Sequence, residues 1–132
     1  MEYFFNWDDK EKSYLADEYS SAFGSVIEGK RMQVAIVHKD KGTGSRLHSH
    51  PNEQFNYVLQ GRFDVKVDDE EKVMGPGELV HIPAGTPHYM IAVSDGGGDY
   101  YVVKDTSWGI AGAAVDGKKT GAHYEPGHEI DK

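Results

Sequence analysis

Residues 47–61 read Leu47-His48-Ser49-His50-Pro51-Asn52-Glu53-Gln54-Phe55-Asn56-Tyr57-Val58-Leu59-Gln60-Gly61. Two histidines two positions apart lie on the same face of an extended strand, because successive side chains point to opposite faces. Glu53 and Gln54 each offer a ligand oxygen, and an apolar run follows them and ends at Gly61. The stretch therefore predicts a metal site built on a β-sheet.

The composition of the chain bounds the class of protein. With 132 residues it is long enough for one domain with a hydrophobic core. A formal net charge of −8 disfavours nucleic acids and anionic membranes as partners, since both attract basic surfaces. The chain has no cysteine, which excludes disulfides and thiolate metal sites and fits a cytoplasmic location. We expect no signal peptide and no membrane span, because the start lacks a basic region followed by an apolar one and no apolar run approaches roughly 20 residues.

Short runs rich in β-branched and aromatic residues fill the middle of the chain, and glycine, proline or aspartate separates nearly all of them. They cover residues 25–28, 32–39, 47–50, 54–60, 62–68, 72–74, 78–82, 88–93, 99–104 and 108–115. Strands spaced by about 8–12 residues are typical of sandwiches and closed barrels. The alternation of strands with long helices that marks a parallel sheet is absent. We therefore predict an all-β fold of about ten antiparallel strands.

We divide the chain into three parts. Residues 1–24 form an N-terminal arm, in which residues 8–19 are either a short helix or irregular. Residues 25–115 form a single β-barrel domain. Residues 116–132 form a polar C-terminal tail, which we expect to be ordered only if it docks on the barrel.

A further ligand of the predicted metal site must come from another strand. Imidazole is the commonest neutral ligand of first-row divalent metals, and the chain has seven histidines. His88 follows the turn Pro83-Ala84-Gly85-Thr86-Pro87 and opens an apolar run, which places it at the start of a strand. His88 is therefore the expected partner of His48 and His50. The other four fit surface, sheet-edge or tail positions: His38, His81, His123 and His128.

The spacing of glycines, prolines and histidines resembles the two sequence motifs of the cupins. The first motif is found at Gly42, His48, His50, Gln54 and Gly61. The second is found at Gly77, Pro83-Ala84-Gly85 and His88. The resemblance implies a conical antiparallel jelly roll with a divalent transition metal (Fe, Mn, Ni, Zn or Co) near one mouth. It also implies four ligands: His48, His50, Gln54 and His88.

The fourth ligand departs from the usual cupin pattern. The usual glutamate falls on Gln54 when counted back from Gly61, and Glu53 is its neighbour. In a regular strand Gln54 shares the inward face of Asn56 and Val58, whereas Glu53 points away, so we favour Gln54. Three imidazoles and an amide are neutral, so a bound divalent ion keeps its full charge. Such a site should favour an anionic, bidentate oxygen ligand and polarise it as a Lewis acid.

The ligand set also resembles the small cupins of pectin and alginate breakdown, which convert unsaturated monouronates to linear keto forms. In those proteins an aspartate and an arginine late in the chain assist the chemistry. Here the corresponding strand ends at Lys104-Asp105, and no arginine follows Arg62. Asp105 or Lys104 could substitute for these helpers, and Asp105 is the candidate catalytic residue, although a strand-end aspartate needs no function.

Four further residues are candidates for the substrate pocket. Arg46, just before the first ligand strand, could bind a carboxylate at the mouth, but a surface arginine is the simpler interpretation. Inward-facing Tyr57, Met90 and Tyr101 could line the pocket and exclude water around the metal, or simply belong to the core.

These observations favour a metal-dependent enzyme that acts on a small, oxygen-rich, anionic metabolite by isomerisation, ring opening or lyase chemistry, with a uronate-like substrate as one option. Two alternatives remain: an Fe(II)-dependent dioxygenase that cleaves a C–C bond, and a non-catalytic cupin that binds a small molecule. We also expect a homodimer that uses the N-terminal arm or an edge strand.

Overall fold

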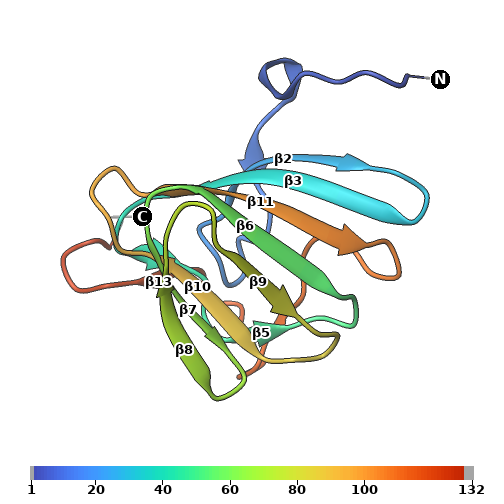
Figure 1. The fold of residues 1–132 in the computed structure, drawn as a ribbon. Coiled ribbons are helices and arrows are strands. Elements are labelled where there is room, and N and C mark those ends of the chain that lie inside the picture. The colour runs from blue at the N-terminus through green and yellow to red at the C-terminus, as the bar shows by residue number, and fades with distance from the viewer. Residues whose placement is uncertain (1, 130–132) are drawn as a thin grey trace.

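The computed structural model describes residues 2–129, and this part of the chain is all-β apart from one 3-10 turn, η1, at Trp7–Asp9 (Figure 1). Its strands are β1 (Ser13–Tyr14), β2 (Phe23–Glu28), β3 (Met32–Lys39), β4 (Thr43–Gly44), β5 (His48–Ser49), β6 (Gln54–Gln60), β7 (Phe63–Val67), β8 (Glu70–Met74), β9 (Leu79–Ile82), β10 (His88–Ala92), β11 (Gly98–Asp105), β12 (Ala113–Ala114) and β13 (His123–Tyr124). Within the described residues, none of the helical segments is long and apolar enough to cross a membrane.

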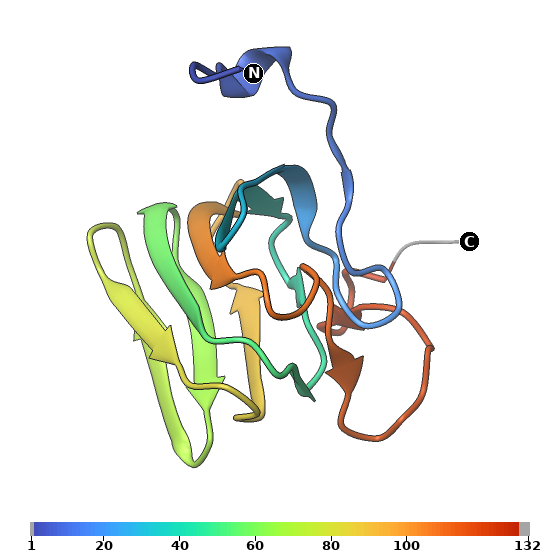
Figure 2. The same cartoon turned by 90° about the vertical axis from the view of Figure 1, so that its right-hand side faces the viewer.

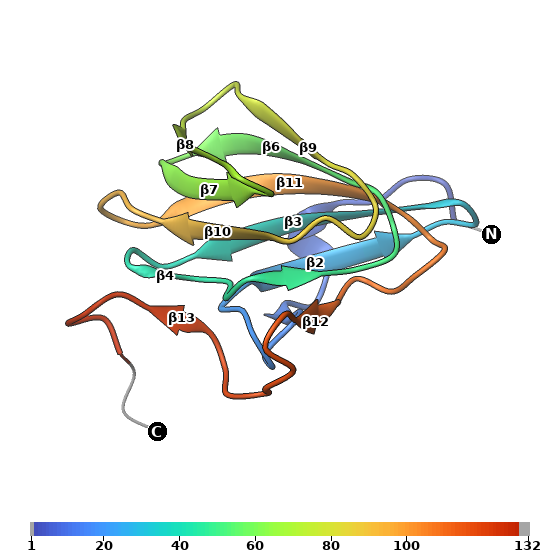
Figure 3. The same ribbon diagram turned by 90° about the horizontal axis from the view of Figure 1, so that it is seen from below.

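The strands form two antiparallel sheets. One has the order β1-β2-β3-β11-β6-β9. The other joins β12, β5, β10, β4 and β13, and β7 links β10 to β8. Apolar side chains of both sheets meet in the interior, and Figure 3 shows the strands of one sheet overlying those of the other. The prediction of a single-domain antiparallel jelly roll is confirmed.

The core follows from the two-residue alternation of the long strands. On β3 and β11 every second residue is buried, and on β6 the same alternation covers the first five residues. Apolar side chains from these faces meet those of the other sheet in one cluster: Ala22, Ala35, Val37, Val58, Phe63, Val65, Met74, Met90, Ala92, Tyr100 and Val102. The inward faces also carry buried polar residues near the ends of the strands, and these surround the site described below.

The turn after β6 takes the chain from one sheet to the other. Gly61 has φ of +79°, a conformation that side-chain-bearing residues rarely adopt. A Cβ at this position would also lie 2.3 Å from the carbonyl oxygen of Gly97. The glycine that ends the first motif is therefore required by both backbone conformation and space.

Most predicted runs are strands, and 32–39 and 54–60 have the predicted bounds. The run 108–115 is wrong except for the two residues of β12. This segment is a loop because two buried side-chain amides bind its carbonyl groups: Gln33 Nε2 donates to Trp108 O (2.9 Å) and Asn52 Nδ2 to Gly109 O (3.2 Å).

Segments of both the arm and the tail pair with strands of the barrel. Residues 13–14 of the arm pair with β2, while the first residues stand away from the barrel (Figure 2). The tail docks, because β13 pairs with β4. Residues 130–132 of the predicted tail lie outside the described residues, and the exact domain boundaries stay a prediction.

Candidate metal centre

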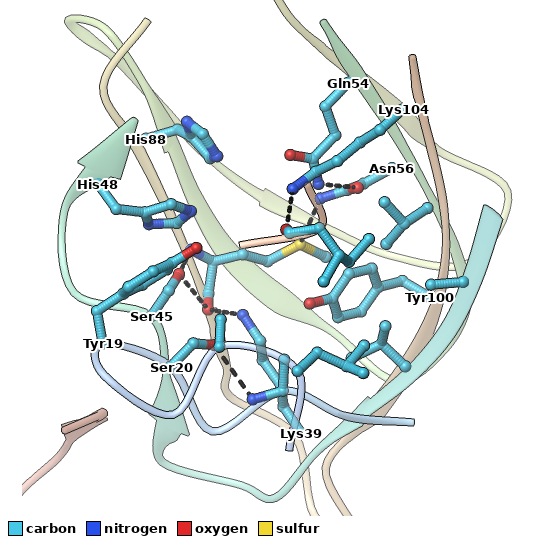
Figure 4. A pocket seen from close by; sticks show the side chains of 18 residues that line it. Tyr19, Ser20, Lys39, Ser45, His48, Gln54, Asn56, His88, Tyr100 and Lys104 are labelled. Atoms are coloured by element: carbon cyan, nitrogen blue, oxygen red, sulfur yellow. Dashed lines mark hydrogen bonds between the residues drawn. The ribbon is translucent and has the colours of Figure 1, made fainter. Parts of the chain in front are cut away.

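The structure brings together three histidines from two strands and the segment between them. His48 on β5 lies opposite His88 on β10 in the antiparallel register, and His50 follows β5 directly. One ring nitrogen from each residue lies within 4.8 Å of the others, which is the spacing that a shared metal ion requires. In Figure 4, His48 and His88 face the interior from the same wall.

The backbone sets the tautomer of each imidazole. Every Nδ1 lies 2.8–2.9 Å from a carbonyl oxygen two residues away in sequence. The acceptors for His48, His50 and His88 are Arg46, Asn52 and Thr86, respectively. A carbonyl oxygen only accepts, so Nδ1 carries the proton and Nε2 keeps its lone pair. Metal-binding histidines are commonly oriented in this way, by a hydrogen bond from the ring nitrogen that does not bind the metal.

Burial keeps the three imidazoles neutral. Desolvation lowers the pKa of His48 and His50, and it lowers the pKa of His88 to about 3. His88 Nε2 is buried and has no hydrogen-bond partner. A buried lone pair without a partner is costly, and a metal ion would satisfy it. The residues present therefore fit a divalent ion.

Gln54 presents its amide oxygen to the same place. Its Oε1 lies 2.8 Å from His50 Nε2, while its own Nε2 donates to Asn56 Oδ1 (2.6 Å). Gln54 is 6% exposed, whereas Glu53 is exposed and its carboxylate binds His81 Nε2 on the outer surface. The amide and not the neighbouring carboxylate lies at the centre.

His48, His88 and Gln54 open on an interior cavity of about 50 Å³ between the two sheets (Figure 4). Tyr19 stacks on His48 with ring centroids 4.3 Å apart, and Met90 on β10 also lines the cavity. Lys39 and Lys104 also line it, and burial lowers their pKa to about 7 and about 8. Among the described residues, no carboxylate lines this cavity.

Tyr57 and Tyr101 lie elsewhere than expected. They are paired across β6 and β11, on the outer face of the sheet, where Tyr57 is 41% exposed and Tyr101 packs edge-on against Trp7. The alternation that directs Gln54 inward directs Tyr57 outward. On β11 it is Tyr100 that points inward, so Tyr101 is one residue out of register with the cavity.

Arg46 and Asp105 also lie outside the cavity. The Arg46 guanidinium donates to the Gly121 and Lys118 carbonyls and to Asp116, so it holds the tail instead of facing a ligand. Asp105, at the exposed end of β11, accepts hydrogen bonds from Ser107 and from the Glu53 backbone, and these lower its pKa. The structure thus gives Asp105 no contact with the centre.

Lys39 was missed from the sequence and the register of Lys104 was left open, although a signal for both exists. Lys39 follows Ala35 and Val37 at two-residue intervals on β3, and Lys104 follows Val102 on β11. Alternation carried to the ends of both strands places these ammonium groups inside.

Comparison with known proteins agrees with this architecture. A family model described as the cupin domain matches residues 35–104, more than half of the chain. The chain belongs to the cupin family. Two curated relatives of this cupin are uncharacterised proteins, one from Methanocaldococcus jannaschii (28% identical; 61% of this chain and 68% of the relative) and one from Streptomyces coelicolor (25% identical; 69% and 85%).

Solved structures share the fold of this cupin. An RmlC-like cupin from Shewanella frigidimarina is 22% identical with a TM-score of 0.67, covering 80% of this chain and 91% of the other. KdgF from Halomonas sp. is 21% identical with a TM-score of 0.67, covering 80% and 94%. Oxalate decarboxylase from Bacillus subtilis, which has Mn(II) centres, is 20% identical with a TM-score of 0.65, covering 76% of this chain and 28% of that one.

Proposed function

We propose that this cupin is a metal-dependent enzyme that acts on a small, oxygen-rich, anionic metabolite by isomerisation, ring opening or lyase chemistry. The proposed ligands are His48, His50, Gln54 and His88. The observation that carries the proposal is the convergence of four neutral donor atoms on a cavity that contains cationic side chains and no carboxylate among the described residues.

The charge of the centre supports an anionic substrate. A divalent ion held by four neutral donors retains its full charge and acts as a Lewis acid on a substrate carbonyl or hydroxyl oxygen. Nitrogen and oxygen donors suit most first-row ions, including Mn, Fe, Co, Ni and Zn. The Mn(II) centres of oxalate decarboxylase, which shares the fold, support an ion of this group.

The lysines supply the proton chemistry that Asp105 was expected to supply. Lys39 Nζ, with a pKa lowered to about 7 by burial, is positioned in the cavity to hold or release a proton near neutral pH. Tyr19 covers His48 and helps to exclude water from this wall. The side chains facing the cavity therefore provide an anion-attracting, partly dry site with one exchangeable proton.

The test begins with elemental analysis of protein purified without chelators, followed by NMR assays with hydroxy- and keto-carboxylates and unsaturated uronates, with and without oxygen. We expect stoichiometric metal and turnover that consumes no oxygen. Oxygen uptake would favour the Fe(II) dioxygenase, and binding without turnover across the panel would favour the non-catalytic cupin. Protein without metal would overturn the proposal.

We also propose that the protein forms a homodimer through the arm and the outer face of the first sheet. Tyr3 and Phe4 on the arm are 76% and 89% exposed, and Tyr57 and Leu79 leave an apolar strip on that face. Large exposed apolar side chains gathered in this way favour an interface. The cytoplasmic location stays a prediction from the cysteine-free composition.

A further inference from the structure

Two lysines are buried in the cavity without an anionic partner. Lys39 is 2% exposed and Lys104 is 5% exposed. Lys39 Nζ donates to Met90 O (2.7 Å), and Lys104 Nζ donates to Ile110 O. Neither ammonium forms an ion pair with a carboxylate of the described residues. An ammonium has three N–H donors, so each lysine retains donors for a ligand.

A buried ammonium without a counter-charge is unfavourable. Removing an ammonium from water without a counter-charge costs several kcal/mol, and a single backbone carbonyl offsets only part of it. An anion that entered the cavity would pair with the ammonium at low dielectric, where the attraction is strong. A ligand with two negative charges would pair with both ammonium groups.

The two lysines approach the metal centre differently. Lys104 extends beside Gln54, whereas Lys39 lies near Ser45 (Figure 4). The two ammonium groups therefore enter the cavity at different places, each beside different residues that line it.

We propose that Lys39 and Lys104 are the specificity-determining residues for a short dicarboxylate, with each ammonium binding one carboxylate. The proposal rests on the proposed function, and it narrows the substrate from an anion to a dianion. A monocarboxylate would leave one buried ammonium unpaired. The cavity of about 50 Å³ restricts the chain between the carboxylates to a few atoms.

The experiment compares malonate with monomethyl malonate, which differs by one negative charge. Calorimetry on the metal-loaded protein should give a Kd for malonate that is at least tenfold lower than the Kd for monomethyl malonate. Lys39→Met and Lys104→Met should each raise the malonate Kd about tenfold or more and change that of the half-ester much less, while Lys30→Met, an exposed lysine, should change neither. Equal affinities for the two ligands, or unchanged malonate binding in both variants, would overturn the proposal.

Two controls separate this proposal from the proposed function. Metal content is measured in each variant, since the lysines are not ligands and wild-type stoichiometry is expected. Thermal unfolding of metal-free wild type with each ligand tests the lysine pair without the metal and without a variant that has to fold. Stronger stabilisation by malonate supports the lysine pair even if the metal assignment fails, and equal stabilisation by the two ligands contradicts it even if the metal assignment holds.

Discussion

His50 Nε2 and Gln54 Oε1 face each other 2.8 Å apart in the barrel interior, although both are acceptor atoms. The His50 proton is on Nδ1, which donates to the Asn52 carbonyl oxygen. The Gln54 amide group donates through Nε2 to Asn56 Oδ1. A cation that contacts both atoms would hold them at this separation, and burial, which lowers the pKa of His50, opposes a second proton on that ring. A metal ion therefore fits this contact.

His50→Ala should remove the metal. Loss of one donor is expected to lower the molar metal content at least about tenfold, because even changes beyond the direct ligands cost 10–100-fold in affinity. Elemental analysis checks this result. His81→Ala is the matched control, since His81 lies on the outer surface beside Glu53 and should retain full metal. Equal metal content in the two variants would rule out the proposed ligand set.

Gln54→Glu should change the ligand preference of the centre. A carboxylate lowers the net charge of the metal site by one unit. The affinity for the metal should therefore rise, and the affinity for anionic ligands should fall. We expect the second change to be about tenfold, which corresponds to a difference of about 1.4 kcal/mol. Malonate titration of the metal-loaded protein measures the second effect. Glu53→Gln removes a carboxylate on the outside and should alter neither affinity. Unchanged or tighter malonate binding in Gln54→Glu contradicts the charge argument.

The stability of the metal-free protein should rise with pH between about 7 and 10, because of Lys39. Its folded pKa of about 7 lies below the unfolded value of 10.5, so the unfolded chain binds more protons in this range and loses them as pH rises. The gain is on the order of a few kcal/mol. Urea unfolding at several pH values should show the slope in wild type and in Lys30→Met, and a reduced one in Lys39→Met, where Lys104, with its pKa lowered to about 8, still contributes. An unchanged slope in Lys39→Met would assign it to other groups.

Arg46→Ala should loosen the C-terminal tail. The guanidinium makes hydrogen bonds to the tail backbone and an ion pair with Asp116, so the expected cost is about 1–3 kcal/mol. Trypsin should cleave after Lys118 and Lys119 faster in Arg46→Ala than in wild type, because the tail is held less tightly. Arg46→Lys, which keeps the charge without the planar fork, should show most of the effect. Loss of anion binding with unchanged cleavage would instead favour a carboxylate-binding role for Arg46.

Phe4→Glu should weaken the proposed homodimer. Exclusion of one aromatic side chain from an interface costs about 1.5–3 kcal/mol, which corresponds to at least a tenfold rise in the dimer Kd. Analytical ultracentrifugation measures it. Val115→Glu is the control, because Val115 is 54% exposed in a loop after β12, away from the arm. A monomeric wild-type protein would overturn the dimer proposal.

The sequence predicted the fold and the core of the candidate site well because both depend on local periodicity. Spacing back from Gly61 and alternation along β6 sufficed to favour Gln54 over Glu53, and the structure places the amide inside. Prediction failed where the register of a strand depends on its partners. Tyr101 was expected inside, but pairing of β11 with β3 and β6 turns Tyr100 and Lys104 inward.

The contacts that decide the roles of Arg46 and the loop 106–112 join residues far apart in the chain, so no local pattern reveals them. Asn52 reaches the carbonyl of Gly109, and Arg46 reaches that of Gly121. The buried lysines are a different case. Their position follows from alternation, but a lysine at the end of a strand is ordinarily solvated, and only the closed barrel removes it from water.

Arg46 connects both ends of the chain to the candidate centre. Its own carbonyl accepts the Nδ1 proton of His48, while its guanidinium holds the carbonyl of Glu18 and, 72 residues away in sequence, that of Lys118. The tail thus helps to hold the proposed metal ligand His48 in its orientation. A shortened form that stops at residue 115 would free Arg46 and relax the orientation of His48. Proteolytic removal of the C-terminal tail should therefore cause loss of the metal before the barrel unfolds.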